Sequence, residues 1–117
     1  MKIEEIAQLL NARIHCIPEG YNKDITHAGA SDLMSDVLAY VDQDILLVTG
    51  LVGPQVIRTI SLMDISAVVF TRGKIPGDDM IEEASKAGIA VLSTDLKSYT
   101  TSGILYSSGI HGIEEDT

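Results

Sequence analysis

The chain has 117 residues, which suits one domain and leaves little room for two. Its formal charge of -9 has the wrong sign for binding nucleic-acid phosphates, while 45% apolar residues exclude a disordered acidic segment. A single cysteine fits a reducing compartment, and neither a signal peptide nor a membrane-spanning run is predicted. We therefore expect a cytoplasmic protein without nucleic-acid or membrane partners.

The N-terminal part predicts one helix and two strands. Residues 2–10 carry apolar side chains at helical spacing, and residues 12–17 alternate as a strand does. A turn at 18–20 follows, and residues 25–30 predict the second strand. The expected inner face of the helix consists of Ile3, Ile6, Leu9 and Leu10.

A further helix is predicted after the second strand, with Ser31 or Asp32 as its N-cap. Asp32 and Asp36 stand four residues apart on one face of this helix, so they could form an acid-base pair or a cation site. The alternative interpretation of these two carboxylates is structural: an N-cap and a solvent-exposed helix face. The expected inner face is Leu33, Met34, Val37, Leu38 and Val41.

Three wholly apolar runs at 45–48, 67–70 and 89–92 predict strands that are buried on both faces. Their even spacing allows a helical crossover and is too long for a hairpin, so the strands should be parallel. A leucine-rich solenoid has a similar period, but its consensus pattern is absent from the sequence.

Each interval between these runs predicts an amphipathic helix. The first begins at Pro54, which suits a first turn, and the second begins at Asp78 and Asp79, which suit a helix N-terminus and its dipole. Gly88 suits the stop of the second helix. The expected inner faces are Val56, Ile57, Ile60 and Met63 in the first and Met80, Ile81, Ala84 and Ala87 in the second.

A last helix is predicted after residue 92, capped by Asp95 and interrupted by Gly103. Its expected inward side chains are Leu96, Tyr99, Ile104 and Leu105. The whole pattern predicts one α/β domain at 1–113, with a mostly parallel sheet and helices on both faces. The acidic segment 114–117 is predicted to be a solvated tail.

Small, polar and basic residues follow the predicted strands. Ligands of open parallel sheets bind beyond the carboxyl ends of the strands, so these loops form the candidate site, and Arg72 suits a carboxylate or phosphate. Turn geometry and helix capping are the alternative explanation for every residue in these loops except the two basic ones, Arg72 and Lys74. The candidate ligand-binding residues are Asp32, Thr49, Gly50, Arg72, Gly73, Lys74, Ser93 and Thr94.

Motifs for established chemistries are absent. Neither the P-loop nor the dinucleotide-binding glycine pattern occurs, so no cofactor is predicted. His15 and Cys16 would point to opposite faces of a strand, and His27 and His111 lack ligand spacing, so no metal site is predicted. Several serines near the C-terminus have no histidine base in a recognisable motif. We therefore predict no catalytic residues.

Residues 28–39, 67–76 and 87–94 occur together in the order typical of one family. With the opening helix and the segment 102–106, nearly the whole chain resembles the DRTGG domain family. Arg72 departs from that pattern, because it stands where a second glycine is expected.

The resemblance implies a regulatory or accessory α/β module. Family members occur beside CBS domains in inorganic pyrophosphatases and in some phosphate acetyltransferases, and the N-terminal domain of HPr kinase/phosphorylase is similar. These relatives place catalysis or nucleotide binding in other domains, and the family is associated with dimer contacts. The resemblance thus implies a non-enzymatic, homodimeric ligand-sensing or protein-interaction module. The alternatives are a binder of a small anionic metabolite or nucleotide, and a small hydrolase or transferase using Asp32 and Asp36.

Overall fold

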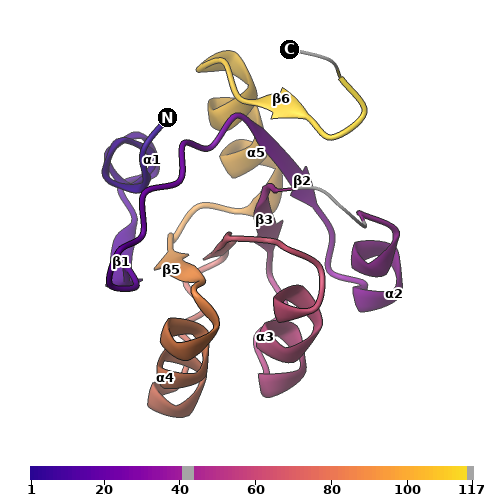
Figure 1. The fold of residues 1–117 in the computed structure, drawn as a ribbon. Coiled ribbons are helices and arrows are strands. Elements are labelled where there is room, and N and C mark those ends of the chain that lie inside the picture. Colours follow the sequence, from indigo (N-terminus) through magenta and orange to yellow (C-terminus); the bar gives the residue numbers. More distant parts are fainter. Residues whose placement is uncertain (41–43, 116–117) are drawn as a thin grey trace.

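The structure is a computed structural model that describes residues 1–40 and 44–115. The described residues form a six-stranded sheet in the order β1-β5-β4-β3-β2-β6 (Figure 1). The strands are β1 (Arg13–Cys16), β2 (His27–Ala30), β3 (Leu46–Thr49), β4 (Ala67–Phe70), β5 (Ala90–Ser93) and β6 (His111–Gly112). Strands β2 to β6 pair in parallel, whereas β1 runs antiparallel to β5. The predicted α/β class and mostly parallel sheet are confirmed.

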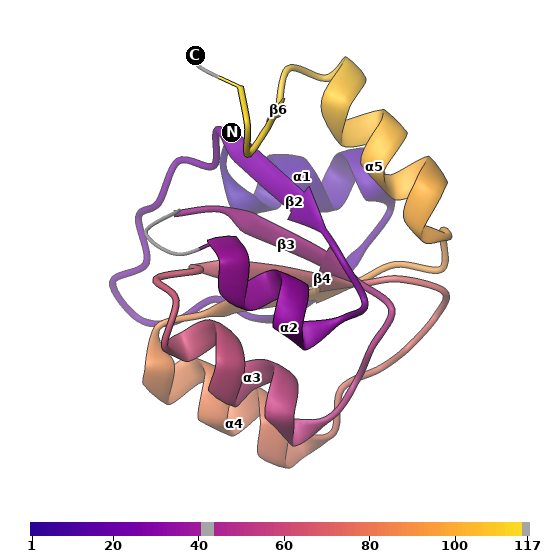
Figure 2. The ribbon, with the colours of Figure 1, turned by 90° about the vertical axis from the view of Figure 1, so that its right-hand side faces the viewer.

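Helices cover both faces of the sheet, as predicted (Figure 2). The helices are α1 (Ile3–Leu10), α2 (Met34–Val37), α3 (Pro54–Ser61), α4 (Asp78–Ala87) and α5 (Ser98–Ser107), and the 3-10 turn η1 (Leu38–Tyr40) follows α2. Helices α1 and α5 pack on one face, against Val48, Val69 and Leu92. Helices α2, α3 and α4 pack on the other, against Leu47 and Val68.

Every residue of β3, β4 and β5 is buried. Burying one aliphatic side chain of this kind contributes about 1.5–3 kcal/mol, so these strands and the helices on either side form the stable part of the fold. The helix ends agree with the sequence as well. Pro54 begins α3, and Gly88 ends α4 with a left-handed φ of 79°.

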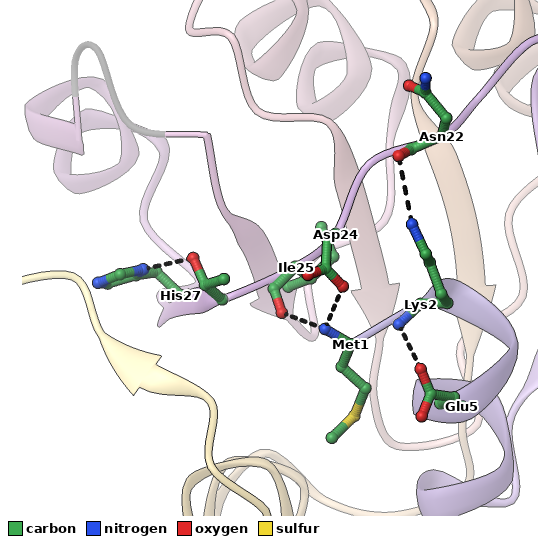
Figure 3. Close-up of polar contacts among 8 residues, drawn as sticks. Met1, Lys2, Glu5, Asn22, Asp24, Ile25 and His27 are labelled. Atoms are coloured by element: carbon green, nitrogen blue, oxygen red, sulfur yellow. Dashed lines mark hydrogen bonds and ion pairs between the residues drawn. The ribbon is translucent and has the colours of Figure 1, made fainter. Parts of the chain in front are cut away.

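Polar contacts fix the start of α1 beside the segment that leads into β2 (Figure 3). The Met1 amino group donates to Asp24 Oδ1 at 2.6 Å and to the Ile25 carbonyl at 2.9 Å. The backbone N–H of Lys2 donates to Glu5 Oε1 at 2.8 Å, which satisfies a free donor at the helix start. The hydrogen bond and the charge of the amino group lower the pKa of Asp24.

The predicted cap of α2 is wrong. The helix begins at Met34, because the hydroxyl of Ser31 accepts from the N–H of Leu33 and the carboxylate of Asp32 binds a different loop. Val37 is buried as predicted, but Leu33 and Leu38 are exposed, because α2 is a single short turn. Val41 lies outside the described residues.

The predictions for α5 also need correction. The helix begins at Ser98 and not after Asp95, because the Thr94 hydroxyl accepts from the N–H of Leu96 and holds a turn there. Tyr99 is 90% exposed, and the helix continues through Gly103 without interruption.

Three smaller features of the fold differ from the predictions. Ala7 takes the inner position expected for Leu9, and Ala87 is exposed at the end of α4. Strand β6 was not predicted, because two residues carry no periodicity. No helix within the described ranges has the length and apolarity needed to cross a membrane.

The left-handed end of α4 gives a stability prediction. Gly88→Ala should lower the free energy of unfolding by about 1–2 kcal/mol, because an L side chain is strained at this φ. Ser85→Ala, at an exposed position in the same helix, should change it by less than about 0.5 kcal/mol. Urea denaturation measures both, and a Gly88→Ala variant as stable as the parent chain would contradict the assignment.

Candidate ligand-binding site

The loops after β2, β3 and β4 lie together at the carboxyl ends of these strands, which we call the carboxyl edge of the sheet. The N–H of Gly50 and the hydroxyl of Thr49 donate to Asp32 Oδ1 at 2.7 and 3.2 Å. Arg72 Nη2 donates to the carbonyl of Gly50 at 3.1 Å. The structure thus brings Asp32, Thr49, Gly50 and Arg72 together. Asp32 thus joins the loop after β2 to the loop after β3 by hydrogen bonds. Asp36 lies exposed on α2, apart from this contact.

The backbone of Arg72 is in the left-handed region, with φ of 61°, and Gly73 follows at 70°. A non-glycine residue there costs about 1–2 kcal/mol. Two backbone hydrogen bonds hold this conformation, from Arg72 to the Leu96 carbonyl at 2.8 Å and from Gly73 to the Thr94 carbonyl at 3.0 Å. The loop therefore has the geometry expected of a glycine but carries an arginine. Strained residues of this kind cluster at functional sites.

The guanidinium of Arg72 lies directly over Gly50. A Cβ atom on Gly50 would be 2.6 Å from Arg72 Nη2, so a side chain there would displace the arginine. No carboxylate of the described residues forms an ion pair with Arg72. Because a guanidinium has five N–H donors and this one bonds one carbonyl, donors remain for an anion from solution.

The other predicted site residues are spread over the same edge. Lys74 is exposed beyond Arg72. Thr94 is buried, and its hydroxyl already donates to the Leu10 carbonyl at 2.8 Å and accepts from Leu96. Gly73 and Ser93 line a separate, small pocket. The predicted set therefore divides into an Arg72 cluster, a pocket and one structural threonine.

This small pocket has a volume of about 230 Å³ and lies where β1 begins and β5 ends. Its lining residues are Asn11, Ala12, Arg13, Gly73, Ile75, Ser93 and Asp95. The hydroxyl of Ser93 is 2.7 Å from His15 Nε2. Burial lowers the pKa of His15, and the nearby charge of Arg13 lowers it further. Sequence reasoning did not include Arg13 and His15 in the site, because no sequence pattern predicts the pairing of β1 with β5.

A larger groove of about 770 Å³ runs along α5 beside β2 and β6. Ala28, Ala30 and Gly103 line it together with Tyr99 and Tyr106, both of which are largely exposed. The sequence predictions placed Tyr99 in the core and therefore did not anticipate this groove.

Other titratable side chains make local structural contacts. His27 Nε2 is 3.0 Å from the carbonyl of Glu115, and its ring lies 5.6 Å from that of His111. The side chain of Glu115 accepts from the N–H of Gly112 at 3.2 Å, at the edge of the sheet. Residues 116 and 117 lie outside the described part. Within residues 1–40 and 44–115, no group of three His, Cys, Asp or Glu side chains has the geometry to hold a metal ion.

These features define a small α/β domain whose polar loops gather at the carboxyl edge of a buried parallel sheet. The family model of the DRTGG domain matches residues 5–108. The chain belongs to the DRTGG domain family, as the resemblance in its sequence implied.

Among solved structures, the chain is similar to the CBS and DRTGG domains of the regulatory region of Clostridium perfringens pyrophosphatase, complexed with the activator diadenosine tetraphosphate. The TM-score is 0.75 at 18% identity, and the match covers 93% of this chain and 47% of that one. The chain thus spans about half the length of that crystallised regulatory region and shares its fold over the matched part. No curated protein matches the chain.

The environment of His15 predicts a titration. Its folded-state pKa lies below the ordinary 6.5, so the unfolded chain binds the proton more readily. The contribution of His15 to the free energy of unfolding is therefore fully present above pH 6.5. It is lost as the pH falls from 6.5 toward the folded-state pKa. NMR titration of the imidazole signals should show this low pKa, and Arg13→Gln should raise it. An unchanged value in Arg13→Gln would contradict the electrostatic cause, and Arg58→Gln, on α3, is the matched control.

Proposed function

We propose that the chain is a cytoplasmic regulatory module without catalytic activity of its own. It senses a small anionic ligand at the carboxyl edge of its sheet and works as a homodimer. Membership of the DRTGG family supports the regulatory role. The lack of an established catalytic motif in the sequence supports the absence of catalytic activity. The unpaired Cys16 fits the reducing cytoplasm.

The observation that carries the choice of ligand is Arg72, whose backbone is strained and whose guanidinium forms no ion pair with the described residues. In a chain of charge -9, Arg72 and Lys74 are two of only eight basic residues, and both follow β4. A guanidinium fixed against Gly50 is preorganised for a phosphate or carboxylate. The pyrophosphatase regulatory region, about half of which this chain matches, was crystallised with the activator diadenosine tetraphosphate, so nucleoside polyphosphates are the first ligands to test.

Melting experiments with diadenosine tetraphosphate and inorganic pyrophosphate test this site. A ligand at about 100 times its Kd should stabilise the parent chain by about 2.7 kcal/mol. Arg72→Ala should abolish this shift and leave the unliganded midpoint almost unchanged, because alanine has the same strain at this φ and only the hydrogen bond to the Gly50 carbonyl is lost. Arg72→Gly should also abolish it while raising the unliganded stability by about 1 kcal/mol.

Arg58→Ala is the matched control, because Arg58 is exposed on α3 and away from the carboxyl edge. This variant should keep the full ligand-induced shift. A parent chain that none of these anions stabilises would contradict the proposal, as would a shift that survives in Arg72→Ala.

The surface around α5 supports self-association. Two copies of charge -9 repel each other unless they meet over an uncharged surface. All ten residues of α5 are uncharged, and they include the exposed Tyr99 and Tyr106 beside a groove floored by small residues. Projecting rings and an adjacent hollow on one surface are the self-complementary arrangement that a two-fold dimer needs. A protein partner on the same surface is the alternative occupant.

Light scattering at micromolar concentration tests this part of the proposal. The parent chain should have twice the mass of one chain, and Tyr99→Glu should weaken the dimer about 30-fold or more, since a central tyrosine contributes about 2 kcal/mol. Leu62→Glu changes an equally exposed apolar residue on the opposite face and should leave the dimer intact. A monomeric parent chain, or a dimer indifferent to Tyr99→Glu, would count against this surface.

A further inference from the structure

We propose that the small pocket between β1 and β5 binds a small zwitterion, namely an α-amino acid with a short side chain. The pocket is separate from the Arg72 cluster, and the inference goes beyond the anionic ligand proposed there. It rests on the charges, the polar groups and the size of the pocket.

Opposite charges line this pocket without pairing with each other. Arg13 and Asp95 both contribute to its walls, and neither forms an ion pair with any residue in the described part of the chain. Asp95 Oδ1 lies 3.3 Å from the position that a Cβ on Gly73 would take, so the carboxylate stands over the glycine at the pocket wall. A ligand with only one charge would be repelled by one of the two groups. A zwitterion satisfies both, with its carboxylate on Arg13 and its ammonium on Asp95.

Neutral polar groups complete the lining. Asn11 contributes an amide, and Ser93 contributes a hydroxyl that is held 2.7 Å from His15 Nε2. Because the pKa of His15 is lowered, this histidine is neutral at pH 7 and adds no second positive charge beside Arg13. The charges that face the pocket therefore balance, as a ligand of zero net charge requires.

The size of the pocket limits the ligand. Its volume of about 230 Å³ is below the roughly 300–1,000 Å³ of sites for drug-sized ligands, so a nucleotide is too large. Ala12 and Ile75 are the apolar lining residues, and they suit a short aliphatic side chain. L-Alanine meets all of these requirements.

Backbone contacts hold the walls in place before any ligand binds. Arg13 pairs with Ser93 across the two strands, and the N–H of Ala12 donates to the carbonyl of Ala7 at 2.8 Å. Gly73 is fixed by its bond to the Thr94 carbonyl at 3.0 Å. The backbone of the pocket therefore needs little rearrangement on binding, and the exposed side chains of Arg13 and Asp95 become ordered by the ligand.

Isothermal titration calorimetry with L-alanine tests the proposal. The parent chain should bind L-alanine, whereas N-acetyl-L-alanine, without the ammonium, and L-alaninamide, without the carboxylate, should each bind about tenfold more weakly or worse. L-Tryptophan should bind more weakly, because its indole ring is much larger than the short apolar surface that Ala12 and Ile75 provide. Absence of L-alanine binding, or equal binding of either analogue or of L-tryptophan, would overturn the proposal.

Two substitutions locate the binding. Arg13→Gln and Asp95→Asn should each weaken L-alanine binding about tenfold or more without lowering the unliganded melting midpoint. Arg58→Gln is the matched control and should bind as the parent chain does. Arg72→Ala should also keep L-alanine binding while losing pyrophosphate, so failure of this pocket and failure of the anion site are distinguishable. L-Alanine binding that is unchanged in both Arg13→Gln and Asp95→Asn would overturn the assignment.

Discussion

The burial of β3, β4 and β5 on both faces is the constraint on which the rest of the structure depends. Every residue of these strands is inside, so helices must cover the sheet on both sides and their connections must cross over it. Parallel crossovers bring the carboxyl ends of the strands to one edge. Since packing uses every side chain of these three central strands, their binding groups are left to the loops at the carboxyl ends of the strands.

Hydrogen bonds between those loops decide which groups remain free. Asp32 is used to brace Gly50, and Thr94 is used to hold α1 through the Leu10 carbonyl. Arg72 is the exception, because the fold forces its backbone into a strained conformation and, within residues 1–40 and 44–115, most of its guanidinium donors have no partner. A cation supported in this way suits recognition of an anion, and the described loops place no general base beside it.

Much of the fold could be predicted, for reasons that individual residues make clear. Continuous apolar runs identify β3 to β5, and Pro54 and Gly88 mark helix ends, because these signals are local. The short helix α2, the two-residue β6 and the exposed Tyr99 could not be predicted, since tertiary contacts decide them. For the site, the parallel direction of the predicted strands placed Arg72 after the carboxyl end of a strand, and in the structure it follows β4. Its contact with Gly50 and the pairing of Ser93 with His15 depend on loop geometry and strand register, which no sequence period encodes.

The central functional claim is that the chain recognises ligands and does not transform them. A turnover screen of the pure protein with nucleoside phosphates, pyrophosphate and acyl phosphates, with and without divalent metal ions, tests this claim most directly. We expect no product to form with any of these compounds, including those that raise the melting midpoint. Robust metal-dependent hydrolysis that a single substitution abolishes would contradict the account.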